Sequence, residues 1–130
     1  MLRVYARSAG RYGVCGLGAY PFVMDLEISV EQLKEQLTSA HPPMLLDVRE
    51  GWEFQTASIG GSTLMPMGEI TGRAHNELDE EQAIAVLCHH GSRSLSVTMW
   101  LREQGYAKAQ SVAGGIDAWS RVVDPAVPRY

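Results

Sequence analysis

Residues 83–94 of this 130-residue chain read AIAVLCHHGSRS, which is a short apolar run, a cysteine, a polar turn and the start of a helix-like segment. The apolar run is partly β-branched and follows an acidic turn, a pattern that predicts a buried parallel strand. Residues 94–104 carry apolar side chains at helical spacing, with Ser92 or Ser94 as the expected N-cap. We therefore expect Cys88 at the carboxyl end of a strand, where open α/β sheets bind their ligands.

A loop between a strand and a helix is a setting that favours the thiolate form of Cys88. The first N–H groups of a helix have no partner within the helix and attract negative charge, and the guanidinium of Arg93 adds to that attraction. The thiolate is the nucleophilic form of cysteine. An inert buried cysteine is the alternative that a strand position by itself favours. Gly91, Arg93 and the helix start favour the reactive one.

The loop resembles the active loop of the rhodanese family of sulfurtransferases, whose form is Cys-x-x-Gly-x-Arg-Ser. The matching residues are Cys88, Gly91, Arg93 and Ser94. Other segments resemble further family motifs, in unbroken order over about residues 26–130: 45–50 with Glu53 and Phe54, 58–62 with Met65 and Pro66, 105–106, and 112–119. Ser58 stands where the family usually has histidine, and Ser62 where it usually has alanine. The resemblance implies an α/β fold with a central, mostly parallel sheet and helices on both faces.

The resemblance also implies an activity, the transfer of a sulfane sulfur through a Cys88 persulfide. The thiolate would attack the outer sulfur of a donor such as thiosulfate or a persulfide, and a thiophilic acceptor would then take the sulfur. Cyanide, a cellular thiol or a thiol-bearing protein are the expected acceptors, and no cofactor is implied. The loop carries Arg93 as its only cation, so thiosulfate and a persulfide both stay open as the donor.

The expected site consists of the catalytic cysteine, its loop and the end of a neighbouring strand. The residues are Cys88 as nucleophile, then His89, His90, Gly91, Ser92, Arg93 and Ser94 of the active loop, with Asp47 and Arg49 at the same sheet edge. Arg93 either stabilises the bound sulfur anion or turns away to pair with a carboxylate. Asp47 either accepts hydrogen bonds from the loop, with Arg49 supplying positive potential, or forms a local ion pair with it.

Two other functions are weighed against sulfur transfer. Dual-specificity phosphatases and arsenate reductases of this fold have five residues between cysteine and arginine, whereas four residues, 89–92, intervene here. The shorter loop suits one extra sulfur atom and is cramped for a tetrahedral oxyanion. A non-catalytic rhodanese-like interaction module is the second alternative, and the retention of Cys88, Gly91 and Arg93 favours the enzyme over it.

The histidines do not predict a metal centre. His89 and His90 are adjacent in a tight loop, so they cannot easily converge with Cys88 on one ion, and no distant Cys or His pair completes a zinc set. We expect both at the rim of the pocket. His41 and His75 stand alone in polar contexts and are expected at the surface.

Composition bounds the function further. The formal net charge of −4 and the lack of a basic patch argue against nucleic-acid binding. No uncharged apolar run approaches about 18 residues, so no membrane span is predicted. Two cysteines, Cys15 and Cys88, do not suggest a disulfide framework, and a catalytic thiol favours the reducing cytoplasm.

Residues 1–23 differ from the rest of the chain. Their only charges are arginines, glycine is frequent, and no helical or strand period is sustained. We interpret them as a disordered tail or as an extension from a misplaced start codon, with Met24 as the true first residue of a domain over 24–130. A secretory signal is the rival interpretation, but residues 12–24 lack a continuous apolar core and a clear cleavage site.

The remaining pattern alternates strands and helices. Ser29 and Gln32 predict a capping box that opens a helix running to about Thr38. Further strands are expected at 44–48, 62–64 and 110–113, and a last helix has Ile116, Trp119 and Val123 on one face. We expect the three tryptophans, Trp52, Trp100 and Trp119, to pack in or near the core.

Overall fold

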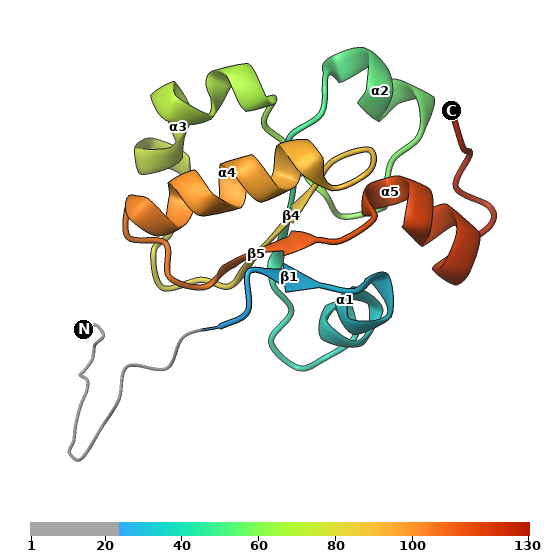
Figure 1. The fold of residues 1–130 in the computed structure, drawn as a ribbon, viewed down its shortest axis with the longest axis horizontal. Helices are drawn as coiled ribbons and strands as arrows, with labels where there is room; N and C mark the ends of the chain where they lie inside the picture. The colour runs from blue at the N-terminus through green and yellow to red at the C-terminus, as the bar shows by residue number, and fades with distance from the viewer. Residues whose placement is uncertain (1–23) are drawn as a thin grey trace.

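The structure is a computed structural model that describes residues 24–130 (Figure 1). The extension expected over residues 1–23 lies outside the described residues. The strands of the described part form one sheet in the order β1-β5-β4-β2-β3, and every neighbouring pair is parallel. They are β1 (Glu27–Ile28), β2 (Met44–Asp47), β3 (Thr63–Leu64), β4 (Ile84–Leu87) and β5 (Ala109–Val112). The predicted parallel α/β sheet is confirmed.

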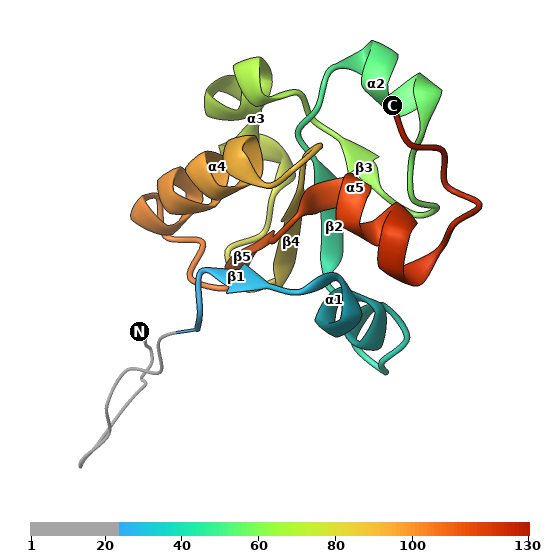
Figure 2. The same ribbon diagram turned by 45° about the vertical axis from the view of Figure 1, so that its right-hand side comes forward.

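Helices cover both faces of this sheet (Figures 1 and 2). They are α1 (Val30–Leu37), α2 (Gly51–Thr56), α3 (Ile70–Glu77) after the short turn η1 (Met67–Glu69), α4 (Ser92–Glu103), and α5 (Gly115–Ala118) with its continuation η2 (Trp119–Val123). α3 and α4 lie on one face, and α1 and α5 lie on the other. No helix among residues 24–130 is long and apolar enough to cross a membrane.

Two cores, one on each face, follow from the alternation of side chains along the buried strands. On β4 and just after it, Ile84, Val86 and Cys88 belong to the core beneath α3 and α4, whereas Ala85 and Leu87 belong to the core beneath α1 and α5. All four residues of β4 are buried, as expected for a central parallel strand. This alternation places Cys88 on the α4 side of the sheet.

The expected strands and helices are found with ends shifted by one or two residues, and the predicted capping box of α1 is present. Ser29 Oγ accepts from the backbone N–H of Gln32, and the Gln32 side chain accepts from the Ser29 N–H. The N-cap of α4 differs from the prediction, because Gly91 occupies it in a left-handed conformation instead of Ser92 or Ser94. β1, α2 and α3 were not anticipated, since these short segments carry too few apolar residues to show a period.

The tryptophans do not all lie in the core. Trp119 is buried and Trp100 is half-buried, but Trp52 on α2 has 64% of its surface exposed, so its expected core position was wrong.

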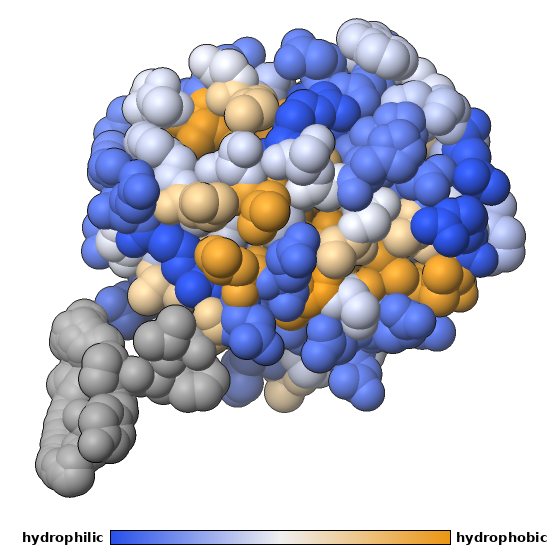
Figure 3. Space-filling model, in the orientation of Figure 1, coloured by the Kyte–Doolittle hydropathy of each residue, from blue (hydrophilic) through white to orange (hydrophobic). Residues whose placement is uncertain are grey.

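Figure 3 shows separate apolar patches among hydrophilic residues on the face seen in Figure 1. A shallow apolar groove is lined by residues of η1, α3 and α4, among them Met67, Ile70 and Trp100.

The far end of α4 fixes the beginning of the described fold. The Arg102 guanidinium donates hydrogen bonds to the carbonyls of Met24, Asp25 and Ala109, at 2.8 to 2.9 Å. It therefore ties the segment before β1 to β5, at the end of α4 opposite the Cys88 loop (Figure 1).

Candidate active site

Cys88 directly follows β4, and its sulfur meets the first turn of α4. The backbone N–H of Gly91 donates to Sγ at 3.0 Å, and the N–H of Ser94 donates at 3.3 Å. Ser94 lies in the first turn of α4, so its N–H has no partner within the helix. This geometry agrees with the expectation that the first N–H groups of the helix attract the thiolate of Cys88. Such donors at a helix N-terminus suit an anionic sulfur.

Cys88 is also enclosed, with 1% of its surface exposed. Its thiol donates to the Ser94 hydroxyl at 3.3 Å, and the Ser94 hydroxyl lies 2.8 Å from the hydroxyl of Ser111 on β5. A reactant therefore reaches Sγ only if its reacting end is small or if the loop opens.

Gly91 is required by the shape of this loop. Its φ of +113° lies in the region that L side chains rarely adopt, and a Cβ there would stand 3.2 Å from the backbone N of Gly114. The turn at Gly91 lets the chain double back so that its own N–H and that of Ser94 reach the same sulfur. The glycine predicted for the active loop thus has a backbone role.

The start of α5 clamps the loop from the other side. The backbone N–H of Ile116 donates to the Cys88 carbonyl at 2.9 Å, and that of Asp117 donates to the His89 carbonyl at 3.1 Å. This approach is possible because Gly115 has no side chain. A Cβ on Gly115 would come within about 2.5 Å of both carbonyl oxygens, and its φ is +60°.

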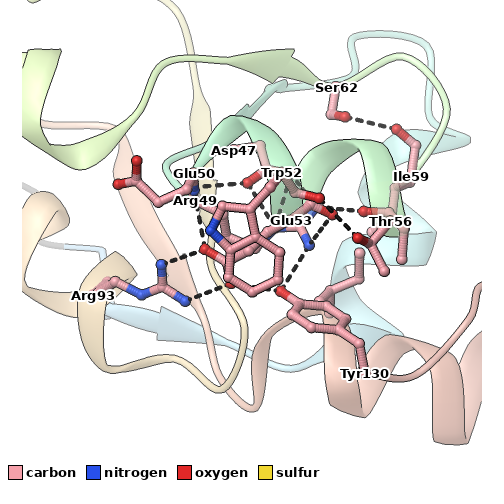
Figure 4. A network of polar contacts seen from close by, with 12 residues as sticks. Asp47, Arg49, Glu50, Trp52, Glu53, Thr56, Ile59, Ser62, Arg93 and Tyr130 are labelled. Carbon is pink, nitrogen blue, oxygen red and sulfur yellow. Dashed lines mark hydrogen bonds and ion pairs between the residues drawn. The ribbon is translucent and has the colours of Figure 1, made fainter.

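Arg93 pairs with a carboxylate on α2 (Figure 4). Its Nη1 lies 2.8 Å from Oε1 of Glu53 and its Nη2 lies 3.0 Å from Oε2, a bidentate geometry. The Glu53 side chain is 5% exposed and the Arg93 side chain is 34% exposed. Of the two roles considered for Arg93, the structure shows the pairing with a carboxylate.

Asp47 and Arg49 form the local ion pair that was the second alternative for them. Nη2 of Arg49 lies 2.6 Å from Oδ2 of Asp47, and both side chains are fully buried. The remaining Arg49 donors reach the carbonyls of Glu53 and Ala57 and the hydroxyl of Tyr130. Asp47 accepts its side-chain hydrogen bonds from Arg49, so the structure does not support the expectation that it accepts from the Cys88 loop.

Tyr130 connects these two ion pairs (Figure 4). Its hydroxyl donates to Oε2 of Glu53 at 2.7 Å and accepts from Nη1 of Arg49 at 2.9 Å. Burial raises the pKa of Tyr130 to about 12, so it is a neutral donor at pH 7. The hydrogen bonds from Arg93 are the main cause that lowers the pKa of Glu53 to about 2, so it is an anionic acceptor. The result is a continuous chain of charged and polar groups from Asp47 to Arg93.

Three aromatic rings line the outside of the loop. The His89 ring stacks on Tyr130 with centroids 4.0 Å apart and on His90 with centroids 3.9 Å apart. His89 is half-buried and His90 is exposed. Burial is the main cause that lowers the pKa of His89, with His90 adding to it, so the His89 imidazole is neutral at pH 7. This placement agrees with the expectation that both histidines form the rim of the site.

His89, His90 and Asp117 are the one group of donors within residues 24–130 that could hold a metal ion, with one ligand atom each within 4.8 Å of the others. Sequence spacing did not point to Asp117 as a third member. Its two carboxylate oxygens already accept hydrogen bonds from Arg121 and Arg129. A cation would have to compete with both arginines, so we do not assign a metal site here.

The structure brings the predicted loop, residues 88–94, around one sulfur, with Ser92 exposed at its edge. It adds Glu53, Ser111 and Tyr130, which the sequence analysis did not include in the site. A hydroxyl within a fully buried strand was the available signal for Ser111. Glu53 stands in a segment that resembles a family motif, but its partner on α4 is not given by that motif. No sequence pattern around Tyr130 indicated that it belongs to the site.

Comparison with known proteins identifies the class of protein. Residues 29–122 match the rhodanese-like domain family, and the chain belongs to that family. A putative sulfur carrier protein of Bacillus subtilis, YrkF, is 34% identical over 120 residues, which are 92% of this chain and 62% of that protein. A sulfurtransferase of Allochromatium vinosum is 30% identical over 95 residues, which are 73% of this chain and 88% of that protein.

Solved structures agree with this assignment. The crystal structure of a rhodanese-like domain protein from Staphylococcus aureus aligns with a TM-score of 0.69 at 28% identity, and the alignment covers 80% of this chain and 97% of that one. The resemblance inferred from the motifs is therefore confirmed, together with the fold. The chain spans less than two thirds of the length of the Bacillus relative, 62% of it.

Proposed function

We propose that this chain is a sulfurtransferase that carries a sulfane sulfur on Cys88. The observation that carries the proposal is the pair of backbone N–H groups, from Gly91 and Ser94, that both donate to Sγ. The family match and the names of the Bacillus and Allochromatium relatives support sulfur chemistry. The four-residue spacing between Cys88 and Arg93 favours one added sulfur atom over a tetrahedral oxyanion.

The mechanism consists of two nucleophilic displacements. The Cys88 thiolate attacks the outer sulfur of the donor, the donor's S–S bond breaks, and the leaving group departs with the bonding electron pair as sulfite or a thiolate. The Cys88 persulfide anion remains. A cellular thiolate or cyanide then attacks the outer sulfur of the persulfide, and the Cys88 thiolate leaves. Charge is conserved in each step.

The main-chain donors supply the stabilisation of the anion. They are held by the turn at Gly91 and by the helix start at Ser94, so they need no reorganisation when charge develops on sulfur. In well-studied oxyanion holes, the loss of one such donor costs about 3 kcal/mol of transition-state stabilisation. The N-terminal end of α4 adds a favourable dipole.

The charges of the site favour a persulfide as donor over thiosulfate. Arg93 is paired with Glu53 and Arg49 with Asp47, so neither guanidinium is free to balance a dianion. A persulfide, on a small thiol or on a thiol-bearing protein, carries at most one negative charge on its sulfur. We place the activity in the cytoplasm, where reduced acceptor thiols are present.

The decisive experiment measures sulfur loading directly. The reduced protein is incubated with thiosulfate, or with a persulfide of a small thiol, and its intact mass is measured. The expected result is the gain of one sulfur atom by the wild type, faster from the persulfide, and no gain by Cys88→Ser. A folded wild-type protein that gains no sulfur from any donor in the panel contradicts the proposal.

The same panel separates the alternatives. The near-complete burial of Cys88 is the observation on which a non-catalytic interaction module would rest. Such a module gains no sulfur. Turnover of an aryl phosphate that is lost in Cys88→Ser would indicate phosphatase chemistry instead.

A further inference from the structure

We propose that Ser111 on β5 is a positioning residue for the anionic sulfur of Cys88 and that it acts through the hydroxyl of Ser94. This inference rests on the proposed function, because it concerns the thiolate and persulfide anions which that function requires. Ser111 lies outside the loop 88–94 and more than 20 residues after Cys88 in the sequence.

The register of the sheet places Ser111 beneath the loop. Ser111 on β5 is the parallel partner of Val86 on β4, and Cys88 stands two residues further along on the same face as Val86. The first turn of α4 covers that face, with Ser94 pointing inward. Cys88, Ser94 and Ser111 each have at most 1% of their surface exposed.

The three side chains form a hydrogen-bonded line. The Cys88 thiol lies 3.3 Å from Ser94 Oγ, and Ser94 Oγ lies 2.8 Å from Ser111 Oγ. Ser94 Oγ also lies 3.1 Å from the carbonyl of Gly91, to which it donates. The single hydrogen of the Ser94 hydroxyl thus has three possible acceptors, this carbonyl, the sulfur and Ser111 Oγ, because either serine can be the donor of the bond between them. When it goes to the carbonyl or to the sulfur, Ser111 is the donor to Ser94.

The protonation state of the sulfur decides between these acceptors. When Cys88 is a thiol, S–H donates to Ser94 Oγ, and the Ser94 hydrogen goes to the Gly91 carbonyl. When the thiol has lost its proton to water, the Ser94 hydroxyl turns and donates to the sulfur anion. Ser111 can donate to Ser94 Oγ in both states, and a hydroxyl that accepts a hydrogen bond becomes a better donor itself. Ser111 therefore strengthens the Ser94 hydroxyl as a donor to the sulfur anion. This hydroxyl is the third donor to the sulfur, after the N–H groups of Gly91 and Ser94.

Packing alone does not call for a hydroxyl at position 111. β5 is buried at all four positions, and a hydroxyl without a partner is costly in such a place, whereas alanine has nearly the same size. The Ser111 hydroxyl finds its partner in Ser94, which itself contacts the reactive sulfur. The charged and titratable groups around the loop have other partners and do not replace this donor: Arg93 on α4, Glu53 on α2, the Asp47–Arg49 pair at the end of β2, Asp117 on α5 and His89 of the loop.

The test compares Ser111→Ala with wild type, with Ser111→Thr, which keeps the hydroxyl, and with Ser120→Ala. Ser120 is a matched control because it is buried and its hydroxyl donates to the Ile116 carbonyl rather than toward the sulfur. Two quantities are measured for each folded protein. One is the rate of Cys88 alkylation by iodoacetamide as a function of pH, and the other is sulfur loading from a small persulfide.

We expect the alkylation profile of Ser111→Ala to move to higher pH, with a rate at neutral pH about three- to five-fold lower, as one weakened hydrogen bond to an anion implies. Ser111→Thr and Ser120→Ala should follow the wild-type profile. The inference is overturned if Ser111→Ala, folded as shown by its denaturation curve, superposes on the wild type, or if Ser120→Ala shifts by the same amount. Failure of the proposed function has a different signature, because the wild type itself then gains no sulfur.

Discussion

Glu53 is the carboxylate that holds the active loop to α2. It accepts two hydrogen bonds from Arg93, one from Tyr130 and one from the backbone N–H of Glu50. Its side chain is almost fully buried, so its charge is tolerated only because these donors surround it. Arg93, for which a sulfur-binding role and a carboxylate-pairing role were both open from the sequence, is thereby paired with Glu53 at the N-terminus of α4.

Stability should depend on the ionisation of Glu53. Its pKa is about 2 in the folded protein and near 4.5 when unfolded, so its contribution is complete above about pH 4.5 and is lost as the pH falls toward about 2. The full contribution of the ionised Glu53 to the free energy of unfolding is about 3 kcal/mol. Glu53→Gln removes it, so the free energy of unfolding should fall less steeply between about pH 5 and about pH 3 than in the wild type. Urea denaturation at several pH values measures this.

Glu31→Gln is the matched control for that experiment, because Glu31 is an exposed glutamate on α1 away from the network. Between about pH 5 and about pH 3, the free energy of unfolding of Glu31→Gln should fall more steeply than that of Glu53→Gln. Identical slopes for Glu53→Gln and the wild type would contradict the role assigned to Glu53.

Tyr130 offers a second test at the level of single side chains. Tyr130→Phe removes the hydrogen bonds to Glu53 and from Arg49 but keeps the ring that stacks on His89. We expect the free energy of unfolding to fall by about 1–2 kcal/mol. Tyr130→Ala should lose more, because the stacked ring and its buried surface go as well. If both variants are as stable as the wild type in urea, the hydroxyl and the ring do not fasten the loop.

Among the secondary-structure elements, α5 binds the backbone of the loop directly. Its first N–H groups bind the carbonyls of Cys88 and His89, so the loop lies between the N-termini of α4 and α5. At this edge of the sheet both helices present N–H groups that have no partner within their own helix and that bind the loop instead. The close approach rests on Gly115, whose missing side chain leaves room for the two carbonyl groups.

Gly115→Ala should therefore disturb both stability and loading. The Cβ would overlap the carbonyl oxygens of Cys88 and His89, and the left-handed φ adds strain. We expect a loss of about 3 kcal/mol in the free energy of unfolding and reduced sulfur gain. Gly60→Ala is the matched control, since a Cβ on Gly60 meets nothing within 4 Å. Unchanged unfolding and loading in Gly115→Ala would show that α5 does not constrain the loop.

For the whole molecule, the sheet and the layers around it could be predicted from the sequence, because they depend on local patterns. The apolar run before Cys88 and the Ser29 capping box are examples, and their bounds are close to those observed. Pairings between distant residues could not be predicted. Glu53 and Arg93 are 40 positions apart, and Arg49 and Tyr130 are 81 apart. Several carboxylates could have paired with Arg93, and only the folded chain selects one.

Access to Cys88 is a further property of the whole fold, because the sulfur lies beneath α4 and the loop. Burial should slow the reaction of native Cys88 with a bulky aromatic disulfide far more than its reaction with a small alkylating reagent, when each native rate is divided by the rate of the same reaction in urea, where the thiol is exposed. Both rates are followed in a Cys15→Ser background, so that Cys88 is the one thiol that reacts. Equal native-to-unfolded rate ratios for the two reagents would show that the loop is open in solution.

The hydrogen bonds of Arg102 bear on how this protein can be handled. They hold the entry of the chain into the fold about 15 Å or more from the Cys88 loop, roughly the length of α4. Tyr130, in contrast, touches His89. An affinity tag, a fluorophore or a surface tether is therefore better attached close to Asp25 than close to Tyr130, because a cargo beside Tyr130 crowds the loop through which sulfur has to pass.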